Sequence, residues 1–551
     1  MRTKILTPLL SFLLMQTASV MAANNQPQWA DRLGVRLSPL NPAFEKYRSA
    51  QTAATKAQSS GPLNSREHRL GYIPPPFVFP ANMGASGQTG VASANAAILP
   101  SRFDLRTSQP LGVTPVRNQY HCGSCWAFGT LGALESHLIY KKNKPTNYSE
   151  EDLILNNGFA NGPCGGGNYA MAAAYLTRWG GPVSERDSPY AYWQGDWSWT
   201  IGSLGSNELP GGVTSPGSLS DTAGVTPPSP GIHIQKVKFL SASNQPLSTP
   251  ERNTLKRAVM TDGAVGVIYW DMPFFYNEST SAFYNDTITD GNHAVTLVGW
   301  DDHFPRSAFN NSPPTDDYPF SVNPPPMDGA FIVKNSWGTE WGDEGYFYLS
   351  YFDTSLQQFT QFLEPETTSN YTRIYEYDPL GMVTAVGIDG AADPETAWMS
   401  NVFMASISAA KIKALGFYAV VPNTQYTIQI RTEVTVGSRN VVDPASGRLV
   451  GSASGTLADA GYNTVKLPEA ARVTANRPFS VIVKLHTPGN QQPIPIETDK
   501  FAYRSRDATS APGQSFISAD GLIWKDAAYI PGTDGTDGIS FNVNLKAFAV
   551  R

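Results

Sequence analysis

One short stretch of the sequence decides the fold, and it contains two of the three cysteines in the chain. It reads Gln119-Tyr120-His121-Cys122-Gly123-Ser124-Cys125-Trp126-Ala127-Phe128. A Cys-x-x-Cys pair can be a redox couple, or its second cysteine can be a catalytic nucleophile. In redox pairs a tryptophan normally precedes the first cysteine, whereas Trp126 follows the second one here. The third cysteine, Cys164, lies nearby in a glycine-rich run, and we therefore favour the nucleophile.

The composition is that of a loop-rich exported protein rather than a charged cytosolic one. The chain has 551 residues, a formal net charge of −6 and 16% charged residues, below the roughly 25% of an average globular chain. This mild acidity argues against a nucleic-acid binder, because phosphate binding needs a basic patch. Three cysteines cannot build a disulfide framework, and their odd number leaves at least one thiol over or paired between chains.

The first residues have the pattern of an export signal. Arg2 and Lys4 precede an apolar run over residues 5–14, and Val20-Met21-Ala22 predicts cleavage after Ala22. The apolar run is shorter than the ~20 residues that a membrane span needs. We therefore predict a secreted, periplasmic or cell-surface protein without a membrane span, in a compartment where a disulfide persists.

Turn residues and composition divide the rest of the chain. Residues 23–98 are polar and include Gly71-Tyr72-Ile73-Pro74-Pro75-Pro76, which predicts extended chain rather than a compact fold. Residues 99–366 have a globular pattern, with loop insertions at 194–230 and 303–328. Residues 367–551 lack helix signals, and the alternation of apolar and polar residues at 479–486 and 540–547 predicts an antiparallel β-sandwich.

Helical patterns precede strands in the middle region, which predicts an α+β fold. Apolar residues at helical spacing predict helices over 125–140 and 170–179. Ser149-Glu150-Glu151-Asp152 predicts a capped helix start. Thr249-Pro250, as N-cap and first helical residue, and Gly263 predict the start and the end of another helix. Strands are predicted at 264–269, 293–300, 330–334 and 345–351.

Several motifs in the middle region resemble the papain family of cysteine peptidases, in the same order along the chain. The first is Cys-Gly-Ser-Cys-Trp at 122–126. Residues 149–153 and 164–166 resemble the family's second helix and the glycine-rich wall of its cleft, and Ser188-Pro189-Tyr190 resembles a further family segment. Residues 292–295 and 334–342 resemble the strands that carry the catalytic histidine and asparagine. The resemblance covers residues 99 to about 360 and implies a two-lobed peptidase with a helical lobe and a β-barrel lobe.

The resemblance implies a catalytic set of Cys125, His293, Asn335 and Gln119. Cys125 would be a thiolate nucleophile, because a helix N-terminus and a neighbouring imidazolium both lower the pKa of a thiol. His293 would be its ion-pair partner and would then protonate the leaving amine. Asn335 would accept a hydrogen bond from the imidazole, and the Gln119 amide would form the oxyanion hole with the backbone N–H of Cys125.

The same resemblance implies further roles. Cys122 and Cys164 would form a disulfide, which leaves Cys125 free. Trp337 would cover the bond between the imidazole and the asparagine. The substrate-binding residues would be Gly123, Gly166, Gly167, Trp337 and Trp341. No cofactor and no metal are expected in the peptidase. His293 lies 168 residues after Cys125, more than the usual ~130–150, and the two loop insertions account for the excess.

The arrangement as a whole resembles a bacterial subgroup of exported papain-like peptidases with a C-terminal lectin-like domain. It implies a signal peptide at 1–22, a pro-segment at 23–98 that lies in the cleft until it is removed, a peptidase at 99–366 and a lectin-like β-sandwich at 367–551. A plain linker is the alternative for 23–98. The sandwich would bind a cell-surface glycan or only shield the peptidase, because a fold does not fix a function.

Two pairs of residues are candidates for ligand contacts in the sandwich. Trp398 and Trp524 could present aromatic faces to a sugar, although such residues are more often part of the core. Asp534 and Asp537 could ligate Ca²⁺ through oxygen, although a solvated turn is the better interpretation of this glycine-rich run.

The sequence therefore predicts an exported endopeptidase that acts on protein or peptide substrates by a Cys-His-Asn mechanism with a thioester acyl-enzyme. The alternative is a carbohydrate-binding surface protein whose peptidase domain is non-catalytic or secondary. The intact set of Cys125, His293, Asn335 and Gln119 favours the peptidase.

Overall fold

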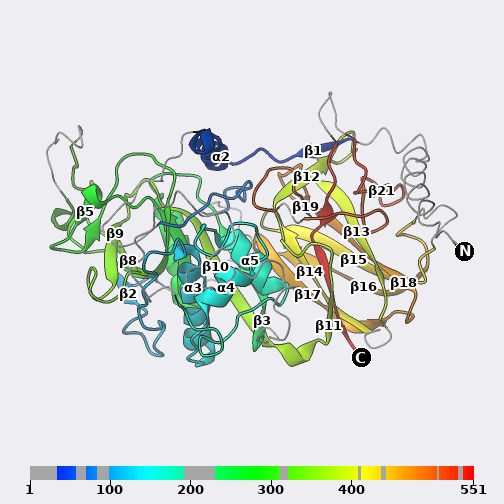
Figure 1. The fold of residues 1–551 in the computed structure, drawn as a ribbon, viewed down its shortest axis with the longest axis horizontal. Coiled ribbons are helices and arrows are strands. Elements are labelled where there is room, and N and C mark those ends of the chain that lie inside the picture. The colour runs from blue at the N-terminus through cyan, green and yellow to red at the C-terminus, as the bar shows by residue number, and fades with distance from the viewer. Residues whose placement is uncertain are drawn as a thin grey trace, which may run out of the picture.

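The computed structural model describes residues 34–56, 70–83, 98–191, 230–310, 321–406, 411–435, 442–505, 508–531 and 538–551. The predicted signal peptide, nearly all of the 194–230 insertion, and the pair Asp534 and Asp537 lie outside these residues. In Figure 1 the helices of the middle region lie near the centre, and the C-terminal sheets lie to the right of them. In the part of the chain that is described, no helix is long and apolar enough to cross a membrane.

Three helices form the helical part of the middle region: α3 (Cys125–Lys142), α4 (Glu150–Asn156) and α5 (Tyr169–Thr177). α4 begins as predicted, because the side chain of Ser149 accepts a hydrogen bond from the backbone N–H of Asp152. The N-cap of α5 is Asn168, whose side chain accepts hydrogen bonds from the backbone N–H groups of Ala170 and Met171. These capped starts fix where the helices begin beside the glycine-rich residues 164–167.

The predicted N-cap of helix α6 (Thr249–Asp262) is wrong by one residue. Its N-cap is Ser248 and not Thr249, because Ser248 and Glu251 form a capping box in which each side chain bonds the other's backbone. Pro250 lies in the first turn and Gly263 ends the helix, as predicted.

The four predicted strands are present, each within one residue of its expected ends: β4 (Val265–Tyr269), β7 (His293–Asp301), β8 (Ala330–Lys334) and β9 (Tyr346–Ser350). Two long strands were not predicted, β3 (Ile232–Leu240) and β10 (Gln357–Thr367), which pair with each other. Together with the short strands β5 (Tyr276–Asn277) and β6 (Ala282–Phe283), they give the order β3-β10-β4-β7-β8-β9-β6-β5. β2 (Arg102–Asp104) pairs with β7.

The C-terminal region is the predicted sandwich. One layer has the order β16-β15-β18-β13-β20-β21 and the other contains β11-β23-β14-β17. An apolar core with Met399, Phe417, Val481 and Leu545 fills the space between the layers. The strands of this region run as follows: β11 (Arg373–Tyr375), β13 (Thr396–Met404), β14 (Lys411–Ala419), β15 (Thr424–Thr432), β16 (Arg448–Leu457), β17 (Gly461–Arg472), β18 (Pro478–His486), β20 (Ser515–Ser518), β21 (Lys525–Asp526) and β23 (Leu545–Val550).

A shared sheet, which was not predicted from the sequence, joins the middle and C-terminal regions. β17 pairs with β3, with Tyr462 opposite Val237, so that one 13-stranded sheet crosses the boundary. Beside this pairing, Asp459 forms ion pairs with Lys236 (2.8 Å) and Lys238 (2.9 Å). The two regions are therefore held together by a common sheet and not by the connecting chain alone.

The N-terminal segment, by which we mean the described residues 34–56 and 70–83, lies across both regions (Figure 1). Its strand β1 (Val35–Leu37) pairs with β12 (Thr384–Ile388), in a sheet that continues with β19 (Ile494–Glu497) and β22 (Asn542–Val543). The expectation that residues 23–98 lack compact structure is wrong over α2 (Pro42–Lys56), a 15-residue helix. Phe44 explains the difference, because it packs edge-on against Tyr503 of the C-terminal region with ring centroids 5.7 Å apart.

Candidate active site

Cys125 is the first residue of α3, and its side chain is completely buried. The loop before it is held by Tyr190, whose hydroxyl lies 2.7 Å from the Ser124 hydroxyl and donates to the backbone oxygen of Gln119 at 2.9 Å. This role of Tyr190 was not predicted, although the residue lies in the Ser-Pro-Tyr motif that carried part of the resemblance. The helix start therefore has a fixed position next to Gln119.

His293 and Asn335 come from neighbouring strands and form the predicted pair. His293 begins β7, and Asn335 directly follows β8, which pairs with β7. The Nε2 atom of His293 donates to Oδ1 of Asn335 over 2.9 Å, and both side chains are buried. Trp337 stacks on the imidazole with centroids 4.8 Å apart, so it covers this bond as predicted. The backbone of Ala294, next to His293, hydrogen-bonds the Cys125 sulfur, which brings Cys125 and the strand that carries His293 together.

Gln119 is fully buried and its side-chain amide bridges the two lobes. Its Nε2 donates to the backbone oxygen of Cys122 at 2.9 Å, and its Oε1 accepts from the hydroxyl of Ser336 at 2.6 Å. Its backbone N–H also donates to the backbone oxygen of Ser336. These bonds orient the amide on the turn that leads into Cys125.

Residues 70–73 of the N-terminal segment lie along the glycine-rich wall beside Cys125. The N–H of Ile73 donates to the oxygen of Gly167, and the N–H of Gly167 donates to the oxygen of Gly71, both over 2.9 Å. A Cβ atom on Gly166 would lie 2.7 Å from the backbone oxygen of Gly71, and a Cβ atom on Gly123 would lie 3.3 Å from the Cα of Gly71. The three glycines predicted to bind substrate thus border a stretch of the chain's own backbone.

The pKa of Cys125 differs from the sequence-based expectation. Burial raises the pKa of this thiol to about 11, while backbone hydrogen bonds from Ala294 and Gly71 lower it only in part. A thiolate without hydration is unfavourable, and here this effect outweighs the backbone dipoles. The predicted low pKa is therefore wrong for the arrangement in which residues 70–73 cover Cys125, because burial there favours the neutral form of the thiol.

The predicted disulfide is present between Cys122 and Cys164, and Cys125 is the free cysteine. Trp341, predicted to bind substrate, stacks on Tyr276 at 4.9 Å and lies edge-on to Trp337 at 5.0 Å. These contacts place it among aromatic residues on the histidine side of the site.

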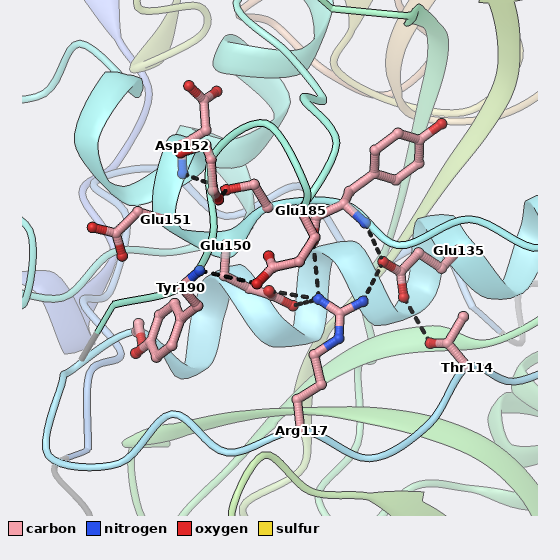
Figure 2. Close-up of polar contacts among 12 residues, drawn as sticks. Thr114, Arg117, Glu135, Glu150, Glu151, Asp152, Glu185 and Tyr190 are labelled. Atoms are coloured by element: carbon pink, nitrogen blue, oxygen red, sulfur yellow. Dashed lines mark hydrogen bonds and ion pairs between the residues drawn. The ribbon is translucent and has the colours of Figure 1, made fainter. Parts of the chain in front are cut away.

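A buried ionic cluster lies behind the site and was not predicted. Figure 2 shows the guanidinium of Arg117 between Glu135 (2.7 Å) and Glu150 (2.6 Å), while Thr114 donates to the other oxygen of Glu135. Burial raises the pKa of Glu150 while the guanidinium of Arg117 opposes this rise, and the two carboxylates raise the pKa of Arg117. The cluster ties the loop before Gln119 to α3 and α4. In the sequence, only the acidic residues 150–152 hinted at this ionic cluster, and helix capping explains those residues equally well.

The candidate ligand contacts of the C-terminal region are placed as follows. Trp524 is buried with Val402 and Phe516, which makes it a core residue. Trp398 is half-buried, and Nζ of Lys484 lies 4.9 Å above its ring. Within the described ranges, no group of three or more His, Cys, Asp or Glu residues could hold a metal ion.

Two family models match the chain. Residues 99–359 match the papain family cysteine protease model, and residues 374–549 match the lectin-like domain model. Together with the fold and the Cys125, His293 and Asn335 geometry, these matches show that the chain carries a papain-family cysteine peptidase domain followed by a lectin-like domain.

Similar proteins were found among curated sequences and solved structures. A viral cathepsin of Cydia pomonella granulosis virus is 30% identical over 251 residues, which are 46% of this chain and 57% of the relative. Falcipain-2a of Plasmodium falciparum is 28% identical over 257 residues, which are 45% of this chain and 41% of the relative. The chain therefore spans about half the length of the curated relatives it matches.

A solved structure resembles nearly the whole chain. The cysteine protease and lectin-like domains of Cwp84, a surface layer associated protein of Clostridium difficile, match with a TM-score of 0.69 and 20% identity. The match covers 94% of this chain and 98% of that one. A second structure, of a Cwp84 variant after propeptide cleavage, matches with a TM-score of 0.62 and 22% identity, over 82% of this chain and 100% of that one. The two-domain fold is therefore shared.

Proposed function

We propose that this protein is a cysteine endopeptidase that hydrolyses peptide bonds in protein substrates. The observation that supports the proposal most is the buried hydrogen bond between His293 and Asn335, beside Cys125 at the start of α3. The fixed amide of Gln119 supports it further, because catalysis of acyl transfer needs a donor oriented in advance.

In the proposed mechanism, His293 takes the proton of the Cys125 thiol and the sulfur attacks the substrate carbonyl carbon. The carbonyl oxygen becomes an oxyanion, which the Gln119 amide and the backbone N–H of Cys125 stabilise; losing one such donor typically costs about 2.7–4 kcal/mol. The C–N bond then breaks as the imidazolium of His293 protonates the leaving amine, and a thioester remains on Cys125. Water, deprotonated by His293, attacks the thioester and releases the acid and the thiol.

We further propose that the N-terminal segment keeps the enzyme inactive until it is removed. The hydrogen bonds of Gly71 and Ile73 to Gly167 support this, because they fill the backbone positions beside the nucleophile. The raised pKa of Cys125 supports it too, because a covered neutral thiol is a poor nucleophile. On this proposal, removal of the segment exposes the sulfur and lets His293 ionise it.

The test compares matched variants of the processed protein in a peptide-hydrolysis assay under reducing conditions. Cys125→Ala and His293→Ala are expected to lose at least about 10³-fold in kcat/KM. His303→Ala is the matched control, because His303 is exposed on the loop after β7, and it should keep full activity. Hydrolysis that persists unchanged in Cys125→Ala would contradict the proposed activity.

We propose that the protein is exported and acts at or near the cell surface. The charged and apolar pattern before Ala22 supports export, and the fold is shared with a surface layer associated protein. Cell fractionation and N-terminal mass spectrometry test this: an unprocessed chain that starts at Met1 and stays in the cytoplasm would contradict it.

A second candidate function, carbohydrate binding, is favoured by the match of residues 374–549 to the lectin-like model. Binding of the processed protein to a glycan array would support it as an additional function. Glycan binding without any peptide hydrolysis by the processed wild type would make it the main function instead.

A further inference from the structure

A polar groove runs over one sheet of the lectin-like domain. It lies on β13, β18, β15 and β16, which are neighbours in that sheet, and its volume is about 520 Å³. Sites for small ligands typically have ~300–1,000 Å³. The lining carries hydroxyl, amide, amine, imidazole and carboxylate groups. We call this feature the sheet groove, and Figure 1 shows its strands at the right of the molecule.

The strands present these groups on the face that points away from the core. On β18, Val483 and Leu485 belong to the core between the two layers. Lys484 and His486 alternate with them, and successive side chains of a strand point to opposite faces. The sheet groove therefore lies on the outer face of the sandwich, open to a ligand from solution.

The strand register arranges this outer face in rows. One row crosses four strands in the order Thr396, His486, Gln425 and Thr456. The adjacent row crosses the same strands in the order Trp398, Lys484, Thr427 and Ser454. Because neighbouring strands lie ~4.8 Å apart, each row is about 14 Å long. That length exceeds a single sugar ring, so the rows suit a ligand made of several linked units.

His486 has a fixed orientation in the sheet groove. The hydroxyl of Thr396 donates to Oδ2 of Asp393 over 2.6 Å, and the same hydroxyl oxygen lies 2.9 Å from Nδ1 of His486. A hydroxyl has one proton to donate, so Nδ1 carries the proton in the second contact. In the neutral ring, Nε2 is then an acceptor. A histidine on a merely solvated face needs no such chain of partners, and this chain therefore points to a role in recognition.

Lys484 is held over the ring of Trp398. Its Nζ lies 4.9 Å from the ring centroid, a cation–π contact that positions the ammonium group. One face of Trp398 is therefore covered by the chain itself. That face is not offered to a sugar, and the indole positions a hydrogen-bond donor instead.

We propose that the sheet groove binds a neutral oligosaccharide through hydrogen bonds to its hydroxyl groups. The proposal rests on the carbohydrate-binding function given above as the second candidate, and it assigns a site to that function. Sugar hydroxyls both donate and accept hydrogen bonds, so their site needs acceptors and donors. Lys484 and Gln425 supply N–H donors, and His486 supplies an acceptor. The hydroxyls of Thr427 and Ser454 do both.

The chemistry of the sheet groove argues against other classes of ligand. An anionic ligand needs mainly donors and positive charge, whereas Asp393 lines the same groove as Lys484. An apolar ligand would leave the polar groups without partners, which is unfavourable. A neutral ligand rich in hydroxyl groups satisfies the donors and the acceptors together.

The test uses the full-length Cys125→Ala chain, so that peptide hydrolysis cannot alter the sample. The chain is first applied to an array of immobilised neutral and acidic oligosaccharides. The neutral oligosaccharide that binds most strongly is then titrated in solution by calorimetry. Gln425→Ala should weaken its binding about fivefold, the equivalent of one hydrogen bond. Thr427→Trp should fill the middle of the groove and weaken binding about tenfold or more.

Gln429→Trp is the matched control for the larger substitution. Gln429 follows Thr427 as the next outward-facing residue of β15, and it lies outside the groove lining. This variant should bind like the parent chain. The urea midpoints show whether each variant is folded, and if Thr427→Trp is not, the Gln425→Ala comparison decides.

The outcomes separate the site from the function. Equal binding by the folded Thr427→Trp and Gln429→Trp chains would overturn the sheet groove as the site and leave carbohydrate binding in place. Binding to acidic oligosaccharides alone would overturn the neutral ligand. A parent chain that binds no oligosaccharide on the array would contradict the carbohydrate-binding function and, with it, this proposal.

Discussion

Gly71 of the N-terminal segment lies against Gly123, in the loop that leads into Cys125. A Cβ atom at this position would lie 2.0 Å from the backbone oxygen of Gly123 and 2.6 Å from its Cα. Both are backbone atoms, so neither can rotate away as the end of a side chain could. Gly71→Ala must therefore displace residues 70–73 from the cleft or move the loop that the Cys122–Cys164 disulfide constrains.

The size of the effect follows from the steric strain in the covered state. Overpacking of a tight site costs about 1–3 kcal/mol. The two backbone hydrogen bonds between residues 71–73 and Gly167 break on uncovering in the wild type and in the variant alike, so they do not change the ratio. The strain alone raises the uncovered population by about 5- to 140-fold, since 1.4 kcal/mol is a factor of ten.

Alkylation of Cys125 by iodoacetamide measures this population, because Cys125 is the free cysteine of the chain. In the unprocessed protein at neutral pH, Gly71→Ala should react about 5- to 140-fold faster than the wild type. Gly231→Ala is the matched control, since a Cβ there meets no atom within 4 Å. Intact mass confirms that the segment is still attached. Equal alkylation rates for the two glycine variants would refute the steric argument.

Three further predictions concern the thiol, the disulfide and the buried cluster. In the unprocessed chain the alkylation rate should keep rising toward pH 11, because burial raises the pKa of Cys125 to about 11. Since the covered state favours the thiol form, alkaline pH should also weaken the binding of the N-terminal segment. An alkylation rate that reaches a plateau below pH 9 would contradict the raised pKa. Replacing Cys122 and Cys164 by Ala opens a crosslink over a sequence separation of 42, and should lower the free energy of unfolding in urea by about 4 kcal/mol. Arg117→Leu leaves two buried carboxylates without their shared cation, and should cost about 3–5 kcal/mol in the same assay; an unchanged urea midpoint would show that the cluster is neutral.

His293 and Asn335 could be predicted from the sequence because residues 292–295 and 334–342 resemble family motifs, and each of the two residues lies at one end of a short apolar strand. The register of β7 and β8 then brings the two strand ends together, and it is set by local apolar patterns that the sequence displays. The start of α3 follows from the apolar pattern after Cys125, whereas the disulfide between Cys122 and Cys164 was implied by the family resemblance.

The features that could not be predicted depend on segments far apart in the chain. The pairing of Tyr462 with Val237, and the ion pairs of Asp459 with two lysines of β3, leave no local pattern. The β-bulge of β10 at Gln358 has none either, because its signature is a backbone angle rather than a residue type. The pKa of Cys125 depends on whether residues 70–73 cover it, which a motif at 122–126 cannot reveal.

The lectin-like domain takes part in holding the N-terminal segment. β1 is bound to the edge of β12, Phe44 packs on Tyr503, and the Nδ2 atom of Asn168 donates both to the oxygen of Ile73 (2.8 Å) and to the hydroxyl of Tyr503 (2.5 Å). Because β3 and β17 place both domains in one sheet, rotation between the domains cannot release these contacts one at a time. The segment must instead leave the edge of β12 and the cleft. On the proposed function, both domains therefore bind the segment that keeps the enzyme inactive. A peptidase domain produced without the lectin-like domain would hold its N-terminal segment more weakly.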